Sequence, residues 1–186
     1  MGYNTGGRLH AIAEKAAAVN APVLIIGLGG TGLDALRITK KLIYDHIKSE
    51  GASSDKPANI EYLGIDTDEC EWRKGFQGMY LNRDAGELKI YTMPDVAGVL
   101  AHPELLPPHI SEWIDTDISA RFVINGAGAV RQLGRLSLMM NLAEVETVLK
   151  EKIEKATAGF SASEPLYVFI LAGISGGTGS IPCGHD

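Results

Sequence analysis

The sequence lacks several features that would assign it to common protein classes. No stretch approaches the ~18 consecutive apolar residues that a membrane-spanning helix needs, so no membrane span is expected. Cysteine is scarce: Cys70 and Cys183 lie far apart with no pairing pattern, which fits a reducing, cytoplasmic environment. A basic surface is also missing, because the net charge is −6, and this argues against general nucleic-acid binding. Residues 1–21 lack the apolar core of a secretory signal and are interpreted as a lead-in, with a helix expected over residues 9–19.

A lysine after a glycine-rich turn is missing too. The pattern G-x-x-x-x-G-K-[ST] is therefore absent, and an ordinary P-loop nucleotidase is not expected. Glycine itself is abundant, with 22 residues, and several of them follow short apolar runs. In the first such stretch, PVLIIGLGGTGLDALR, Val23–Ile26 predicts a buried parallel strand, and the glycines expose backbone N–H groups at the start of a helix. We therefore expect a phosphate to bind at Gly27–Gly32.

The rest of the chain alternates between predicted strands and helices. Further strands are expected at residues 60–65, 88–91 (an edge strand) and 166–171, and residues 122–125 lead into a second glycine turn. Helices are expected at residues 31–48, 96–100 and 110–114, with one long helix from about 130 to 156 and irregular structure over 72–86. Alternation of this kind predicts a three-layer, Rossmann-like α/β fold with a doubly wound parallel sheet, truncated after about four strands. Residues 22–180 would form this partial nucleotide-binding domain, and residues 181–186 a tail.

Apolar spacing predicts which face of each long helix is buried. In the first helix one stripe contains Leu36, Ile43 and Ile47, while Arg37, Lys40 and Lys41 lie off it. In the long helix the expected apolar face consists of Leu138, Leu142, Val145, Leu149 and Ile153. Two exposed i,i+4 ion pairs are expected on its other face, Glu146–Lys150 and Glu151–Lys155. The strand at 166–171 would be an exposed hydrophobic edge if no further strand pairs with it.

Four turns are expected to meet at one edge of this sheet, because strand-to-helix turns of a parallel sheet all open on the same edge. They are Gly27–Gly32, Asp66–Glu69, Gly126–Ala129 and Gly173–Ser180. The glycine turns supply N–H groups for an oligophosphate, and the acidic turn offers the oxygen ligands that Mg²⁺ prefers. The sequence therefore predicts a crevice for a nucleotide and Mg²⁺.

The same four turns resemble a known family. AGISGGTGS at residues 172–180 resembles the signature loop of the tubulin/FtsZ superfamily, and GLGGTGLDA resembles its first phosphate loop. IDTDE resembles the second loop and GAGAVRQLGR the third, all in the family's order. Within the superfamily the chain most resembles the bacterial tubulin-like domain proteins. The resemblance implies binding of GTP or GDP with Mg²⁺, a cytoplasmic location, and a full-length parent that is a self-associating, filament-forming GTPase.

The resemblance also implies roles for individual residues. The residues expected to contact the nucleotide are Gly29, Gly30, Thr31, Gly32, Asp34, Gly126, Ala127, Gly128, Ala129, Arg131, Gln132, Arg135, Ser175, Gly176, Gly177, Thr178, Gly179 and Ser180. Asp34 would lie near the base and Arg135 near the sugar, while Asp66 and Asp68 would hold the metal. Two positions depart from the family pattern. Gln132 replaces an acidic ribose contact, and Arg131 adds a cation at a proline-type position.

The resemblance covers only the first half of the family's GTP-binding domain, about residues 22–180. The acidic loop that activates water comes from the next subunit in this family and is not found in the present sequence, so we expect nucleotide binding without turnover. Two alternatives stay open. One is a Rossmann-type domain that binds NAD or FAD, or adenylates with ATP, through Gly27–Gly32, although Asp66 lies beyond the ~20-residue spacing of that motif. The other is a non-enzymatic interaction module.

Overall fold

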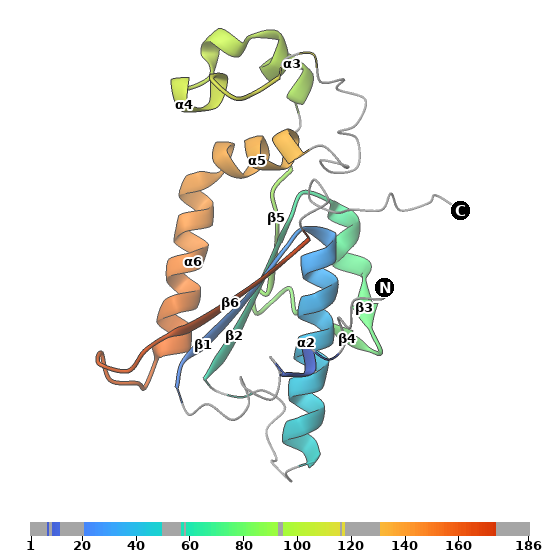
Figure 1. The fold of residues 1–186 in the computed structure, drawn as a ribbon, viewed down its shortest axis with the longest axis vertical. Coiled ribbons are helices and arrows are strands. Elements are labelled where there is room, and N and C mark those ends of the chain that lie inside the picture. The colour runs from blue at the N-terminus through green and yellow to red at the C-terminus, as the bar shows by residue number, and fades with distance from the viewer. Residues whose placement is uncertain are drawn as a thin grey trace.

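The fold is built around a four-stranded parallel sheet with helices on both faces (Figure 1). The structure is a computed structural model that describes residues 7, 9–11, 21–49, 57, 59–92, 95–115, 117 and 131–173. The strands lie in the order β5-β2-β1-β6, which requires crossover connections between parallel neighbours. This arrangement confirms the predicted α/β class and its parallel sheet.

β1 (Val23–Leu28) and β2 (Ile60–Asp66) form the centre of the sheet, and both lie where the sequence predicts them. Nearly every side chain of the two strands is buried, because helices cover both faces of the sheet. β6 (Tyr167–Ala172) pairs with the other side of β1. β5 (Leu88–Ile90) pairs with the end of β2, and it is the edge strand that the sequence predicts.

Helix α2 (Gly29–Ser49) follows β1 without a connecting loop and crosses one face of the sheet. Its predicted extent is confirmed, and its fully buried residues include Leu36 and Ile43. Arg37 and Lys40 lie off the apolar stripe as expected, yet both are buried. Each is buried because an acidic partner from elsewhere in the chain meets it.

The segment after β2 is more regular than predicted. A 3₁₀ helix, η1 (Glu69–Arg73), follows β2. Two short antiparallel strands, β3 (Gly75–Phe76) and β4 (Met79–Tyr80), then form a hairpin. The two turn residues between these strands have positive φ angles of 48° and 77°, the combination that a tight two-residue hairpin turn requires. The prediction of irregular structure over residues 72–86 was therefore wrong in part, because strands of two residues leave no detectable alternation in the sequence.

The predicted long helix is two helices, α5 (Arg131–Met140) and α6 (Leu142–Thr157), which run in different directions (Figure 1). They separate at Asn141, whose Nδ2 donates a hydrogen bond to the carbonyl oxygen of Ser137 at 2.8 Å. The single helix and its continuous apolar face were therefore wrong. α6 packs against β2 and β1, whereas α5 belongs to a different apolar cluster.

The buried face of α6 also differs from the prediction. Its fully buried positions are Val148, Lys152 and Ala156, whereas Leu142 and Ile153 of the predicted stripe are exposed. The break at Asn141 separates only Leu138 from the stripe; within α6 the buried face is centred on Val148, Lys152 and Ala156, beside the predicted stripe, so Leu142 and Ile153 fall at its exposed margin. Three of its members, Leu138, Val145 and Leu149, do pack against the sheet. The exposed Glu146–Lys150 pair is confirmed, with a distance of 2.7 Å.

Residues 95–115 form a small helical unit above the sheet (Figure 1). It contains α3 (Val96–Ala101), the 3₁₀ helix η2 (Pro103–Leu105) and α4 (Pro108–Ser111). α3 confirms the helix expected at 96–100. α4 begins at Pro108 and ends at Ser111, so it overlaps the helix predicted at 110–114 only at residues 110 and 111. An apolar cluster joins this unit to α5: Val96, Leu100, Leu106, Ile110, Ile114, Leu133 and Leu136.

Some predictions fall on parts of the chain that the structure does not describe. Residues 122–125, the turns at 126–129 and 174–180 and the tail at 181–186 lie outside the described residues, as does most of the helix at 9–19. Among the described helices, none has the length and apolar character to cross a membrane. Within the described sheet, β6 is an edge strand whose Val168 and Ile170 are exposed, as expected for this strand.

Candidate functional site

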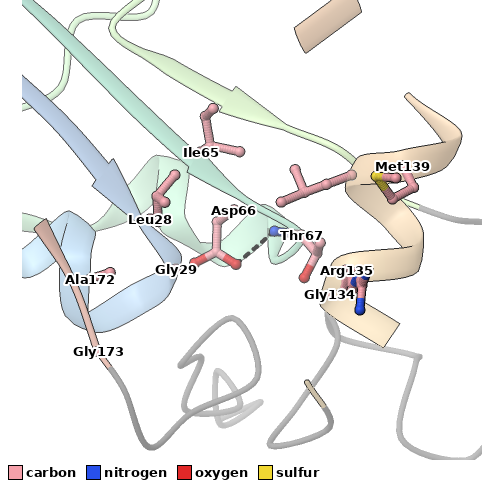
Figure 2. A pocket seen from close by; sticks show the side chains of 11 residues that line it. Leu28, Gly29, Ile65, Asp66, Thr67, Gly134, Arg135, Met139, Ala172 and Gly173 are labelled. Atoms are coloured by element: carbon pink, nitrogen blue, oxygen red, sulfur yellow. Dashed lines mark hydrogen bonds between the residues drawn. The ribbon is translucent and has the colours of Figure 1, made fainter. Parts of the chain in front are cut away.

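A cavity of about 340 Å³ opens at the carboxyl ends of the strands. Figure 2 shows its lining between the ends of the strands and α5. The lining residues are Leu28, Gly29, Ile65, Asp66, Thr67, Gly134, Arg135, Leu138, Met139, Ala172 and Gly173. The first glycine turn, the acidic turn and the start of the fourth turn therefore border one cavity. This is the edge at which a parallel α/β sheet places its ligands.

The first turn brings the beginning of α2 to this cavity. Gly29 lines the cavity with φ at +69°, a left-handed conformation that favours glycine, and α2 starts at this residue. Gly30 is buried, and Thr31 is exposed. No acidic side chain lies in the first turn of α2, so nothing on the helix neutralises its partial positive end. The start of α2 is therefore suited to an anion.

Gly32 has a clear packing role. A Cβ built on Gly32 would lie 2.3 Å from the carbonyl oxygen of Leu171, and one on Gly27 would lie 2.7 Å from the carbonyl oxygen of Gly32. These contacts show that α2 lies directly against the ends of β1 and β6. The glycine pattern is thus explained in part by close helix–strand packing, which is one of its roles in dinucleotide-binding folds.

The fourth turn begins beside the first. A Cβ on Gly173 would lie 2.9 Å from the Cβ of Thr31 and 3.0 Å from its Oγ1. The predicted contact residues Ser175, Gly176, Gly177, Thr178, Gly179 and Ser180 lie outside the described residues. Their turn leaves β6 at Gly173, so the chain enters it directly next to Thr31.

Backbone N–H groups in and just after the acidic turn donate hydrogen bonds to the carboxylates of the turn. Asp66 ends β2, lines the cavity and accepts hydrogen bonds at Oδ1 from the backbone N–H of Thr67 (2.6 Å, Figure 2) and of Asp68 (3.3 Å). Asp68 caps η1 by accepting from the backbone N–H of Cys70 at 2.9 Å. Its second oxygen, Oδ2, is buried and has no hydrogen-bond partner among the described residues.

The carboxylates of Asp66 and Asp68 are the groups predicted to bind Mg²⁺. Both are oxygen donors, and Asp66 borders the cavity whereas Asp68 is not among its lining residues. The described part of the chain contains no group of three or more His, Cys, Asp or Glu side chains that would hold an ion by themselves. Asp66 is thus an oxygen donor at the cavity, and Mg²⁺ is usually bound by one or two carboxylates together with waters and phosphate oxygens.

Asp34, expected near the base, is engaged elsewhere. Its Oδ1 pairs with Nη1 of Arg37 at 2.9 Å, and its side chain is exposed and absent from the cavity lining. Arg37 is itself buried and donates from Nη2 to the backbone oxygen and to Oε2 of Glu71, at 2.9 and 2.8 Å. This arginine therefore joins α2 to η1, the helix that follows the acidic turn.

Helix α5 supplies the other side of the cavity. Arg135 lines it, and the guanidinium of Arg135 lies over the ring of Trp113 at 4.1 Å. Gln132 is partly buried, and its Oε1 accepts from the backbone N–H of Asp115 at 2.8 Å. Arg131 begins α5, but its side chain is not described, and the third-turn residues Gly126, Ala127, Gly128 and Ala129 lie outside the described residues.

Sequence reasoning missed several cavity residues. Thr67 stands inside the recognised acidic turn and was a natural candidate. Gly134, Leu138 and Met139 follow the third turn by one or two helical turns, where only the direction of α5 decides what they face. The sequence carried no signal for the Trp113–Arg135 contact, because the two residues come from separate elements.

Comparison with known proteins gives one finding. The model of a family described as tubulin like matches residues 24–181 of the chain. The comparison with curated proteins and the comparison with solved structures found no match.

Proposed function

Because the chain belongs to the tubulin-like family, we propose that it binds a guanine nucleotide, GTP or GDP, in the cavity at the carboxyl ends of β1, β2 and β6. One observation carries the proposal. The start of α2, the Asp66 carboxylate, the Arg135 guanidinium and the beginning of the fourth glycine turn all border that cavity. This set provides N–H donors and a cation for an anionic ligand, and an acidic group for a cation that accompanies it.

The phosphates would bind at the first and fourth turns. Backbone N–H groups at Gly29, Gly30, Thr31 and Gly32 would donate to phosphate oxygens at the positive end of α2. The turn at residues 174–180 would grip the phosphates from the side of β6, with hydroxyl groups from its serines and threonine. Support comes from the approach of Gly173 to Thr31, which brings the two turns together.

The sugar and the metal would lie on the other side. Arg135 would donate to sugar or phosphate oxygens, with Gln132, Arg131 and the turn at 126–129 nearby. Asp66 and Asp68 would hold Mg²⁺, which supplies charge neutralisation for the phosphates when it is bound. Asp34 would contact the base only if its ion pair with Arg37 opened, so its predicted role is the least supported.

We further propose that this chain binds nucleotide without measurable turnover by itself and that its parent self-associates in the cytoplasm. The sequence resemblance supports this, because the water-activating loop of such proteins comes from a neighbouring subunit. Robust GTP hydrolysis by purified chain free of contaminating enzymes would contradict the first part. Sedimentation with and without GTP would test self-association.

The identity of the nucleotide is the first test. The purified chain is denatured, and any released nucleotide is identified by ion-exchange chromatography. GDP or GTP is the expected result. Release of NAD or FAD would favour the Rossmann-type alternative, in which the same glycine turn holds a dinucleotide.

A binding titration tests the site itself. Calorimetric titration with GTP and Mg²⁺ is expected to show binding that the double substitution Gly29→Ala and Gly177→Ala abolishes or severely weakens. Gly159→Ala is a matched control, because Gly159 also has positive φ (+88°) but has nothing within 4 Å of the added Cβ and lies before β6, not at the cavity. Unchanged affinity in the double variant would overturn the proposal.

A further inference from the structure

Trp113 is part of the connection between the helical unit at residues 95–115 and α5. The apolar cluster joins the unit to α5 through Ile110 and Ile114 on one side and Leu133 and Leu136 on the other. Trp113 is partly buried and packs against this cluster. The unit therefore rests on the helix that carries the cavity-lining arginine.

Two further contacts, in addition to the apolar cluster, hold the unit at residues 95–115 in a defined position on α5. The ring of Trp113 lies 4.1 Å from the guanidinium carbon of Arg135, and the backbone N–H of Asp115 donates to Oε1 of Gln132 at 2.8 Å. Three consecutive residues, 113 to 115, thus contact α5 through a ring, an aliphatic side chain and a backbone hydrogen bond. A flat guanidinium stacks well on an aromatic face, and such a contact restricts the otherwise flexible arginine side chain.

The hydrogen-bonding capacity of Arg135 is left for a ligand. Within the part of the chain that the structure describes, Arg135 forms no ion pair, whereas Arg37 pairs with two carboxylates. A stacked guanidinium still presents its five N–H donors around its edge, because the aromatic contact uses only its face. An arginine held in this way at a cavity wall is arranged to meet an anion or a hydroxyl oxygen.

We propose that Trp113 is a positioning residue of the nucleotide site, which holds the Arg135 guanidinium at the cavity by stacking. This inference rests on the proposed function and adds to it a residue from the unit at 95–115, which the cavity lining does not include. The aromatic ring is the essential feature. A leucine at this position would keep an apolar side chain against the cluster but would not restrain the guanidinium.

The first test compares two substitutions at one position. Trp113→Leu keeps an apolar side chain and removes the ring, and it is expected to weaken GTP binding roughly two- to fivefold, as the usual strength of a cation–π contact to an exposed arginine implies. Trp113→Phe retains a ring and is expected to preserve most of the affinity. Thermal unfolding of each variant shows whether the fold is intact. Arg83→Ala is the control, because Arg83 stacks on Trp72 at 4.8 Å and does not line the cavity, so GTP affinity should not change.

A double-mutant cycle shows whether Trp113 acts through Arg135. Arg135→Ala is expected to weaken binding, and Trp113→Leu should then add nothing further in the Arg135→Ala background. Equal effects of Trp113→Leu in both backgrounds would overturn the inference, since Trp113 would then affect binding independently of the arginine. So would folded Trp113→Leu protein with wild-type affinity.

Fluorescence supplies a readout that a purely structural role would not change. In a Trp72→Phe background Trp113 is the only tryptophan. Its emission is expected to change in intensity or wavelength as GTP is added, with the same Kd that calorimetry gives. Constant emission during calorimetrically observed binding would count against the inference alone. A wild-type chain that binds no nucleotide would instead overturn the proposed function, and this inference with it.

Discussion

The two faces of the sheet are covered to different extents. α2 lies over β1, β2 and β6, whereas α6 lies over β2 and β1 and makes no comparable contact with β6. The register between β1 and β6 makes the difference quantitative. Ile26 and Ile170 are paired neighbours in the same row of the sheet, yet Ile26 is 8% exposed under α6 and Ile170 is 64% exposed.

The two faces also bury charge differently. On the α2 side, Arg37 and Glu71 form an ion pair whose side chains are 1% and 0% exposed. On the α6 side, Lys152 and Glu61 pair at 2.8 Å with 3% and 8% exposed. Among the described residues, α2 thus covers three strands of the sheet and α6 covers two. Four predictions test this contrast, in order of decreasing size.

Breaking the most deeply buried ion pair should have the largest effect. Arg37→Met removes the buried cation at Oε2 of Glu71 and leaves that carboxylate only the partly exposed Lys74 at Oε1, so it should lower the free energy of unfolding by about 3–4 kcal/mol. Lys152→Met should have a smaller effect, because Glu61 is less deeply buried than Glu71. Urea denaturation measures both. Lys150→Met, in an exposed pair, should leave stability unchanged; equal losses in all three variants would show that burial does not set these effects.

The paired isoleucines test how α6 covers the sheet. Ile26→Ala should destabilise the protein by about 2–4 kcal/mol, since it leaves a cavity under α6. Ile170→Ala changes the same residue type in the neighbouring strand, and it should cost little because most of the side chain is already in water. Unfolding of the two variants is compared by circular dichroism. A loss of similar size at Ile170 would mean that another part of the protein covers β6 in solution.

Close packing of α2 is tested at Gly32. Gly32→Ala places a Cβ 2.3 Å from the carbonyl oxygen of Leu171, so α2 must move away from β6, at a cost of about 2–3 kcal/mol. Chemical denaturation gives the value. Gly159→Ala serves as the comparison: the added Cβ meets nothing within 4 Å, and only the positive φ opposes it. If Gly32→Ala were as stable as the wild type, α2 would not pack against β6 as closely as the structure indicates.

Each face of the sheet also carries a buried tyrosine whose ionisation should lower stability at high pH. Burial, followed by the neighbouring Tyr44, Glu87 and Glu61, raises the pKa of Tyr62 on the α2 side well above its ordinary value of 10.0. On the α6 side, burial and then Glu144 raise the pKa of Tyr91 to about 12.

Because the folded-state pKa values are raised, the unfolded chain loses its tyrosine protons first as the pH rises. For Tyr91, stability is therefore retained below pH 10 and lost between pH 10 and about 12, by about 1 kcal/mol at one pH unit above 10, and Tyr62 changes stability in the same direction. Urea denaturation from pH 8 to 11 measures the loss. Tyr62→Phe and Tyr91→Phe should each reduce it, and a pH dependence unchanged in both variants would contradict the assignment.

Much of the site's framework was predictable because it depends on local patterns. The buried strands at β1 and β2 appear as short apolar runs, and the glycine turn after β1 and the acidic turn after β2 follow immediately. Parallel pairing then brings those turns to one sheet edge without further information. Asp34 does not line the cavity, and its side chain pairs with Arg37 instead. Arg37 is held by Glu71, 34 positions further along the chain, and no local pattern in the sequence indicates that contact.

Local sequence patterns were enough to predict the α/β class, the glycine turn after β1, the acidic turn after β2 and the family resemblance. The separation of α5 and α6 at Asn141, the contact of Arg135 with Trp113 and the burial of particular charges follow instead from tertiary packing. Lys40 meets Glu87 across 47 residues and Lys152 meets Glu61 across 91. The physical reason is that periodicity reports the environment averaged along one element, whereas a buried charge or a stacked arginine depends on one particular partner delivered by the packing of another.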